Sequence, residues 1–95
     1  MQPTKKQLEI IERAGTALCK PSEAAKLAGL PVDTFKHEIQ NEESELYRAY
    51  YSGFENTKLK LKESTIAIAL QGSSPAQTLA FDLIRKSEME MEEDL

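Results

Sequence analysis

Apolar residues in the N-terminal part of the chain recur with the spacing of short α-helices. Leu8, Ile11, Ala14 and Leu18 follow one another three or four positions apart, which places them on one face of a helix. Thr4 precedes this run and is a good cap, because its hydroxyl can accept a hydrogen bond from a free backbone N–H. The pattern predicts a first helix that starts after Thr4 and runs to about Leu18.

The next stretch predicts two short helices joined by a tight turn. Pro21 suits the first position of a helix, and Gly29 can take φ > 0 without strain. Ala25, four residues before that glycine, offers a small surface where two helices cross. Phe35 and Ile39 lie one turn apart on the apolar face of the second helix. This combination is typical of a DNA-binding helix-turn-helix.

A single long helix is predicted next. Asn41 is a suitable cap, and no proline interrupts the chain from there to Gln71, a span of about 30 residues. An apolar stripe with coiled-coil spacing runs along it and consists of Tyr47, Tyr50, Phe54, Thr57, Leu61, Ser64 and Ile68. Leu59, Ile66 and Leu70 lie off that stripe. The second half is therefore apolar on two faces, as in a subunit of a bundle or ring.

The clearest break in the chain follows this helix. Gly72 can end it as a left-handed residue, and Ser74 with Pro75 can start another helix. Leu79 and Leu83 share one face of that last helix, which we expect to fold back on the long helix as an antiparallel hairpin. The remaining segment, SEMEMEEDL, is either a helical extension or a disordered acidic arm.

Together these elements predict an all-α protein with three parts. An N-terminal helix-turn-helix domain covers residues 1–41, and a long-helix/short-helix hairpin used for oligomerisation covers residues 42–86. An acidic C-terminal tail covers residues 87–95.

Charge is distributed unevenly along the 95 residues. The net charge is −4, which by itself disfavours a DNA-binding protein. Residues 87–95 hold five of the sixteen acidic residues and no basic one, so residues 1–86 carry twelve basic and eleven acidic residues. A nearly neutral body makes few phosphate contacts per copy. Tight binding to double-stranded DNA would therefore require several copies acting together.

The second helix of the pair would place its outward residues in the major groove. Thr34 and Gln40 can hydrogen-bond to base edges, and Lys36 and His37 can reach phosphate or guanine. His37 has an ordinary alternative as an uncommitted surface side chain. The set contains no arginine, and Asp33 repels phosphate, so the pattern indicates weak sequence specificity.

Composition disfavours several kinds of chemistry. One Cys and one His leave no disulfide framework, no Cys/His zinc site and no nucleophile–base set. Cys19 is most simply a small buried residue. No apolar run approaches the roughly 20 residues of a membrane-spanning helix. We therefore expect a cytoplasmic protein that is not an enzyme and uses no metal, cofactor or membrane.

Two stretches resemble the small terminase subunits of tailed bacteriophages. They read EAAKLAGLPVDTFKHEI and ESELYRAYYSGFENTKLKLKESTIAIALQGSSPAQTLAFDLIRK. In that family a helix-turn-helix ending in a Thr-Phe-type recognition helix precedes an acid–x–Leu/Phe–x–x–aromatic–x–x–Gly pattern. A long helix, a glycine break and a last apolar helix follow. The likeness covers about residues 8–86.

The resemblance implies a viral DNA-packaging protein in the cytoplasm of the bacterial host. Members assemble through the helical hairpin into homo-oligomeric rings, here expected to hold about eight to eleven copies. They bind the packaging site, deliver DNA to the large terminase subunit and regulate it. The likeness implies phosphate contacts from Lys20 and Lys26. The implied contacts between copies come from Tyr50, Phe54, Leu61, Ile68, Leu79 and Leu83.

One departure from that family and two alternatives accompany the resemblance. Many members continue into a strand segment that contacts the large subunit, whereas this chain has an acidic tail. We expect the tail either to make that contact or to mimic DNA against a basic surface of the large subunit. The first alternative is a phage or mobile-element transcriptional regulator that binds DNA as a helix-turn-helix dimer. The second is a structural adaptor that no longer touches DNA, which the neutral body and Asp33 favour.

Overall fold

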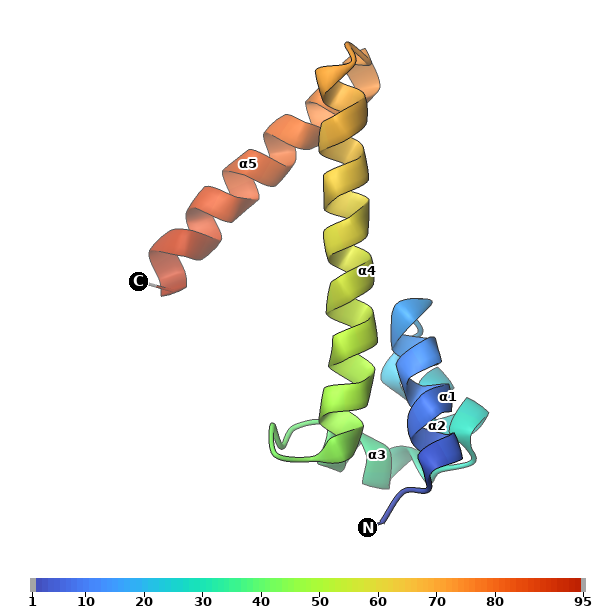
Figure 1. Cartoon of the computed structure of the whole chain (residues 1–95). Coiled ribbons are helices and arrows are strands. Elements are labelled where there is room, and N and C mark those ends of the chain that lie inside the picture. The colour runs from blue at the N-terminus through green and yellow to red at the C-terminus, as the bar shows by residue number, and fades with distance from the viewer. Residues whose placement is uncertain (1, 95) are drawn as a thin grey trace. The chain divides into compact units, whose positions relative to one another are not determined.

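The computed structural model describes residues 2–94, and these form five α-helices without a strand (Figure 1). The residues divide into two compact units, the first ending at Lys58 and the second beginning at Leu59. The sequence places a boundary at residue 41 instead. The helices are α1 (Lys5–Thr16), α2 (Pro21–Ala28), α3 (Val32–Glu38), α4 (Glu45–Leu70) and α5 (Ser74–Asp94). The protein is all-α, as the sequence predicts.

Helix α1 begins as predicted and ends earlier than predicted. The Thr4 hydroxyl accepts a hydrogen bond from the Gln7 backbone N–H, and the Gln7 side chain accepts one from the Thr4 N–H. This reciprocal pair satisfies two backbone donors that the helix itself leaves free. The helix ends at Thr16 rather than near Leu18, because Leu18 adopts a left-handed conformation with φ 60°. That residue turns the chain toward α2.

The turn between α2 and α3 has the left-handed glycine that the sequence predicts. Gly29 has φ 70°, and the Leu30 backbone N–H donates to the Ala25 carbonyl at 2.8 Å. This bond closes the C-terminus of α2 in the manner of a left-handed glycine cap. At the other end of α2, Lys20 occupies the cap position and makes no side-chain hydrogen bond to the helix. The cap is poor, as the sequence indicates.

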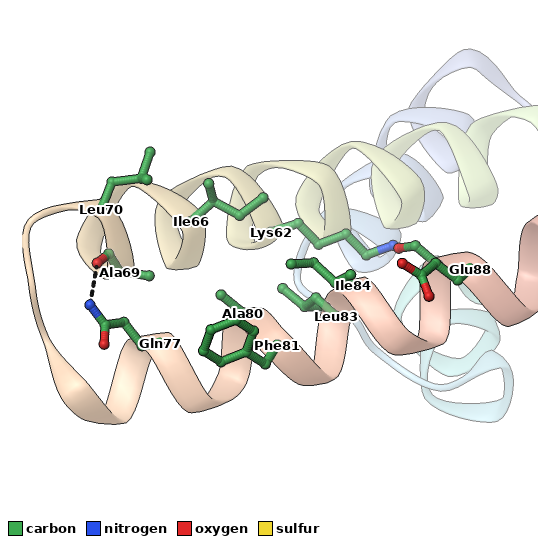
Figure 2. Close-up of a pocket in the computed structure, with 11 residues that line it drawn as sticks. Lys62, Ile66, Ala69, Leu70, Gln77, Ala80, Phe81, Leu83, Ile84 and Glu88 are labelled. Carbon is green, nitrogen blue, oxygen red and sulfur yellow. Dashed lines mark hydrogen bonds between the residues drawn. The ribbon is translucent and has the colours of Figure 1, made fainter.

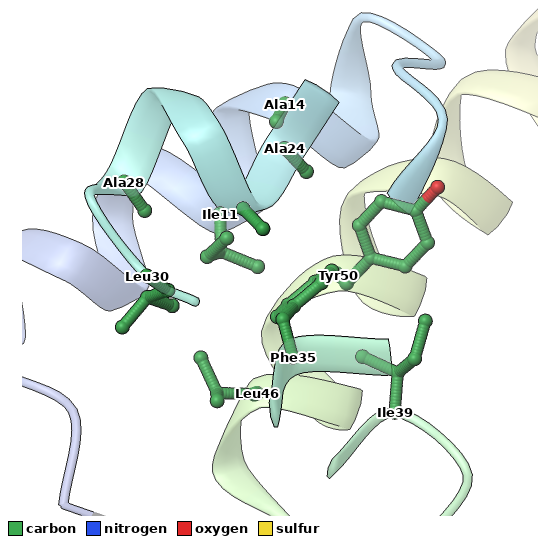
Figure 3. Close-up of a cluster of buried hydrophobic side chains, with 10 residues drawn as sticks. Ile11, Ala14, Ala24, Ala28, Leu30, Phe35, Ile39, Leu46 and Tyr50 are labelled. Carbon is green, nitrogen blue, oxygen red and sulfur yellow. The ribbon is translucent and has the colours of Figure 1, made fainter. Parts of the chain in front are cut away.

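The core of the first unit is built from all four of its helical segments. Ile11 of α1, Ala24 of α2, Phe35 of α3 and Leu46 of α4 are fully or almost fully buried (Figure 3). Tyr50 joins them, with its ring 5.7 Å from that of Phe35 in an edge-on arrangement. The beginning of α4 therefore belongs to the same core as α1, α2 and α3.

Helix α4 is shorter than predicted, with 26 residues from Glu45 to Leu70. Its cap is Ser44 rather than Asn41, because the Ser44 hydroxyl accepts a hydrogen bond from the Leu46 N–H at 3.2 Å. The Asn41 side chain instead accepts from the Glu43 N–H within the preceding turn. The Ser44 hydroxyl also donates to the Glu38 carboxylate, which joins the start of α4 to the end of α3.

The second unit contains the end of α4 and the whole of α5. Gly72 has φ 99° and donates its N–H to the Ala69 carbonyl, which ends α4 as predicted. Ser73 rather than Ser74 caps α5, because the Ser73 hydroxyl accepts a hydrogen bond from the Ala76 N–H at 3.4 Å. Beyond the turn, α5 lies beside the last turns of α4, and the Gln77 side chain donates to the Ala69 carbonyl.

The acidic segment is helical. Helix α5 continues without a break from Ser74 to Asp94, so the helical extension is the correct one of the two conformations that the sequence allows. No helix among residues 2–94 is long and apolar enough to cross a membrane.

Candidate nucleic-acid interface

Helix α3 buries one side in the core and leaves the other at the surface. Phe35 is fully buried, and Ile39 is buried directly after the helix. Lys36 and His37 are exposed, and Thr34 is half-buried. Because the buried residues anchor α3 to α1, α2 and α4, its outer side chains are held on a fixed support.

Gln40 lies outside the helix on which the sequence places it. Helix α3 ends at Glu38, and the Gln40 N–H donates to the His37 carbonyl in the following turn. Gln40 is exposed there. Its assignment to the outward face of α3 is therefore corrected, because the residue belongs to the turn after the helix.

Three lysines lie in or beside α2 and α3. Lys20 is at the start of α2, Lys26 is in its last turn and Lys36 is in the last turn of α3. All three are exposed. Within residues 2–94 the ion pairs are Lys58–Glu55 and Arg85–Asp82, so none of the three lysines is neutralised by a carboxylate at ion-pair distance. Each can contact a phosphate.

Acidic side chains limit this surface. Asp33 is exposed in the first turn of α3, and Glu23 is exposed in the first turn of α2. Glu38 is half-buried and accepts the Ser44 hydroxyl. The segment from residue 20 to residue 40 therefore has three lysines and three acids. It can contact a few phosphates, and it has no dense positive field that would bind any polyanion strongly.

Nothing around this surface indicates acid–base or metal chemistry. Among residues 2–94 no three His, Cys, Asp or Glu side chains gather closely enough to hold a metal ion. Cys19 is half-buried, and its hydrogen bond to Glu23, followed by burial and the Glu23 charge, raises the pKa of its thiol. A raised pKa leaves little thiolate at neutral pH.

Tyr50 is not available to a second copy, which corrects its assignment to a subunit interface. It is 3% exposed, and its hydroxyl donates to the Cys19 carbonyl at 2.6 Å. Burial is the main cause that raises the pKa of this phenol. Phe54 is half-buried against the same core, with the Lys58 ammonium 5.6 Å from its ring. Both aromatic residues stabilise the first unit.

The other four residues assigned to contacts between copies lie at the surface of the second unit. Leu61, Ile68 and Leu79 are exposed, and Leu83 is half-buried. Phe81 and Ile84 line an apolar groove of about 590 Å³ between the end of α4 and α5 (Figure 2). Phe81 and Ile84 are three residues apart, and this helical spacing is the signal that could have found this face.

The packing of α1 on α4 depends on two glycines whose role sequence reasoning also missed. A methyl group added at Gly15 would collide with the backbone of Tyr50, and one added at Gly53 would collide with the Glu12 carbonyl. The two helix backbones therefore approach so closely that no larger residue fits. This close approach places Tyr50 within hydrogen-bonding distance of the Cys19 carbonyl, just after the end of α1.

Comparison of the chain with protein-family models, curated proteins and solved structures finds no match.

Proposed function

We propose that this protein binds double-stranded DNA through α2, the Gly29 turn and α3. The observation that supports this most directly is the set of lysines at positions 20, 26 and 36, exposed and without ion pairs, around a helix whose opposite side is fully buried. Two short helices with a left-handed glycine between them form a helix-turn-helix, which lays its second helix in the major groove. Phosphate contacts then position α3, and Thr34 and His37 face the bases.

The proposed biological role is that of a small terminase subunit. Many copies would bind the packaging site of a viral genome and deliver it to the large motor subunit, as the sequence resemblance implies. The small number of exposed lysines on this surface of each copy supports a multi-copy binder over an isolated one, because several weak sites on one assembly gain affinity by acting together.

The second unit supports self-assembly. Ten large apolar side chains in it are between 46% and 83% exposed, whereas the described part of the first unit exposes only Leu18, at 41%, and Leu27, at 58%. Monomeric proteins seldom leave that much apolar surface in one region, and such patches mark interaction sites. The cluster consists of Leu59, Leu61, Ile66, Ile68, Leu70, Leu79, Phe81, Ile84, Met89 and Met91.

A charge reversal on α3 tests the DNA assignment. In fluorescence anisotropy with a labelled duplex, the double variant Lys36→Glu/His37→Glu should bind at least about tenfold more weakly at 100 mM salt, because a phosphate-facing position and a neighbouring base-facing position both become negatively charged. Lys60→Glu, the same reversal on an exposed position of the second unit, is the matched control and should stay within about twofold. Unchanged binding by the α3 variant would show that this surface does not contact DNA.

A further inference from the structure

One side chain fastens the start of α1 to the end of α2. The Gln7 amide oxygen accepts a hydrogen bond from the Thr4 N–H, and the Gln7 amide nitrogen donates to the Ala28 carbonyl at 3.3 Å. Ala28 is buried in the last turn of α2, where a helix leaves carbonyls without an internal partner. Gln7 therefore holds the first turn of α1 beside the connection from α2 to α3 (Figure 1).

The residues before this turn lie against the other end of α3. Gln2 and Pro3 line a hollow of about 230 Å³ together with Glu38, the last residue of α3. Thr34, which the proposed function directs at the bases, lies one helical turn before Glu38 and therefore on the same side of α3. Residues 2–7 thus run alongside α3, from its last turn to the connection that precedes its first turn.

Two lysines lie at the centre of this segment. Lys5 and Lys6 belong to the first turn of α1, and both are exposed. Within residues 2–94 neither forms an ion pair, and the first turn of α1 holds no acidic residue. Two ammonium groups there oppose the partial positive charge at this end of a helix, so they lower its stability. Helix stability therefore does not account for these two lysines.

We infer that Lys5 and Lys6 are further DNA-contacting residues, which bind backbone phosphates beside the base pairs that α3 reaches. An ammonium group binds a phosphate oxygen by a charge-assisted hydrogen bond, and Gln7 holds both lysines beside α3. They add to the phosphate contacts of the three lysines in and beside α2 and α3. The inference rests on the proposed DNA binding through α3 and deepens it, because it adds an element outside the helix-turn-helix.

Reversing both charges tests the inference. In fluorescence anisotropy with a labelled duplex at 100 mM salt, Lys5→Glu/Lys6→Glu, the α1 variant, should bind at least about fivefold more weakly than wild type. Its midpoint of thermal unfolding should equal that of wild type or rise, because acidic residues suit the first turn of a helix. A merely structural role would not weaken binding in a variant that is as stable as wild type.

The matched control makes the same charge change elsewhere. Lys60→Glu/Lys86→Glu, at two exposed positions of the second unit, should bind within about twofold of wild type. Wild-type affinity in the α1 variant, with binding lost in the α3 variant, would overturn the inference and leave the proposed function standing. Wild-type affinity in both variants would contradict the proposed function, and the inference with it.

Acetylation of the wild-type protein provides a second measurement that needs no variant. Mass spectrometry after treatment with an amine-acetylating reagent, with and without the duplex, measures how fast each lysine reacts. The duplex should slow the acetylation of Lys5 and Lys6 as it slows that of Lys36, and it should leave Lys60 unchanged. Slowing at Lys36 without slowing at Lys5 and Lys6 would overturn the inference, even if the α1 variant failed to fold.

Discussion

Gly15 of α1 and Gly53 of α4 each lie against the backbone of the opposite helix. A methyl group at Gly53 would meet the Glu12 carbonyl and the Thr16 backbone, and one at Gly15 would meet the Tyr50 carbonyl. The contact is supported by a hydrogen bond from the Thr57 hydroxyl to the Thr16 carbonyl at 2.6 Å. Close approach of two backbones is what lets a short α1 fix the first half of α4.

The Gly53→Ala variant should therefore lose stability. In an unobstructed helix the change from glycine to alanine stabilises by about 1 kcal/mol. Here the new methyl group overlaps backbone atoms that cannot rotate away, and we expect a net loss of about 2 kcal/mol in the free energy of unfolding. Urea denaturation measures it. Ser52→Ala, exposed and adjacent on α4, should stay within about 0.5 kcal/mol. A stabilised Gly53→Ala protein would contradict the close packing.

Tyr50→Phe should destabilise the protein and change its response to alkali. Loss of the donor to the Cys19 carbonyl leaves a part-buried acceptor unpaired and should cost about 1–2 kcal/mol at pH 8. The pKa of Tyr50 is raised in the folded protein by burial. The stability that Tyr50 contributes is therefore fully present below about pH 10, the pKa of an unfolded tyrosine. It is lost as the pH rises through the higher pKa of Tyr50 in the folded protein.

Urea denaturation at pH 8 and pH 10.5 separates these effects. Wild type should lose stability between the two pH values, and the Tyr50→Phe variant should lose less. An equal loss in both proteins would show that Tyr50 does not titrate as its burial requires.

Ser44→Ala should weaken the start of α4. The variant removes both the cap on the Leu46 N–H and the hydrogen bond to the Glu38 carboxylate, and we expect a loss of about 1–2 kcal/mol. Asn41→Ala removes only a bond within an exposed turn, so it should cost less than about 0.5 kcal/mol. Thermal unfolding of the two variants measures the difference, and the reverse order would place the cap at Asn41.

The salt dependence of DNA binding should be shallow for each copy. Three lysines near α3 predict a slope of about −3 for log K against log salt per bound copy, since each neutralised phosphate contributes about −0.9. Lys36→Gln should reduce the magnitude of that slope by about one. Anisotropy titrations from 50 to 200 mM salt, with an assembly-defective variant to isolate one copy, provide the values. A slope near zero would contradict phosphate contacts.

Local chemistry made much of the fold predictable. The Thr4 cap, the left-handed Gly29 and the break at Gly72 each follow from a property of one residue and its neighbours. The cap of α4 was missed because Asn41 and Ser44 are both good cap residues, and the choice depends on Glu38, which Ser44 reaches in space.

The partners of apolar faces could not be predicted in the same way. The spacing that joins Tyr50 to Leu61 is one continuous stripe in sequence, yet Tyr50 is buried within its own chain and Leu61 is exposed. Periodicity identifies an apolar face without identifying what covers it. The sequence of α4 does not reveal the role of Gly53, because that role depends on the backbone of α1 lying against it.

The most direct test of this account is native mass spectrometry of the wild-type protein with and without a DNA duplex of about three helical turns. We predict a single closed assembly of about eight to eleven copies, to which the duplex adds, and which loses the duplex but keeps its copy number in the Lys36→Glu/His37→Glu variant. A clean dimer would contradict the packaging role and favour a transcriptional regulator. An assembly that binds no duplex even at low salt would contradict DNA binding itself.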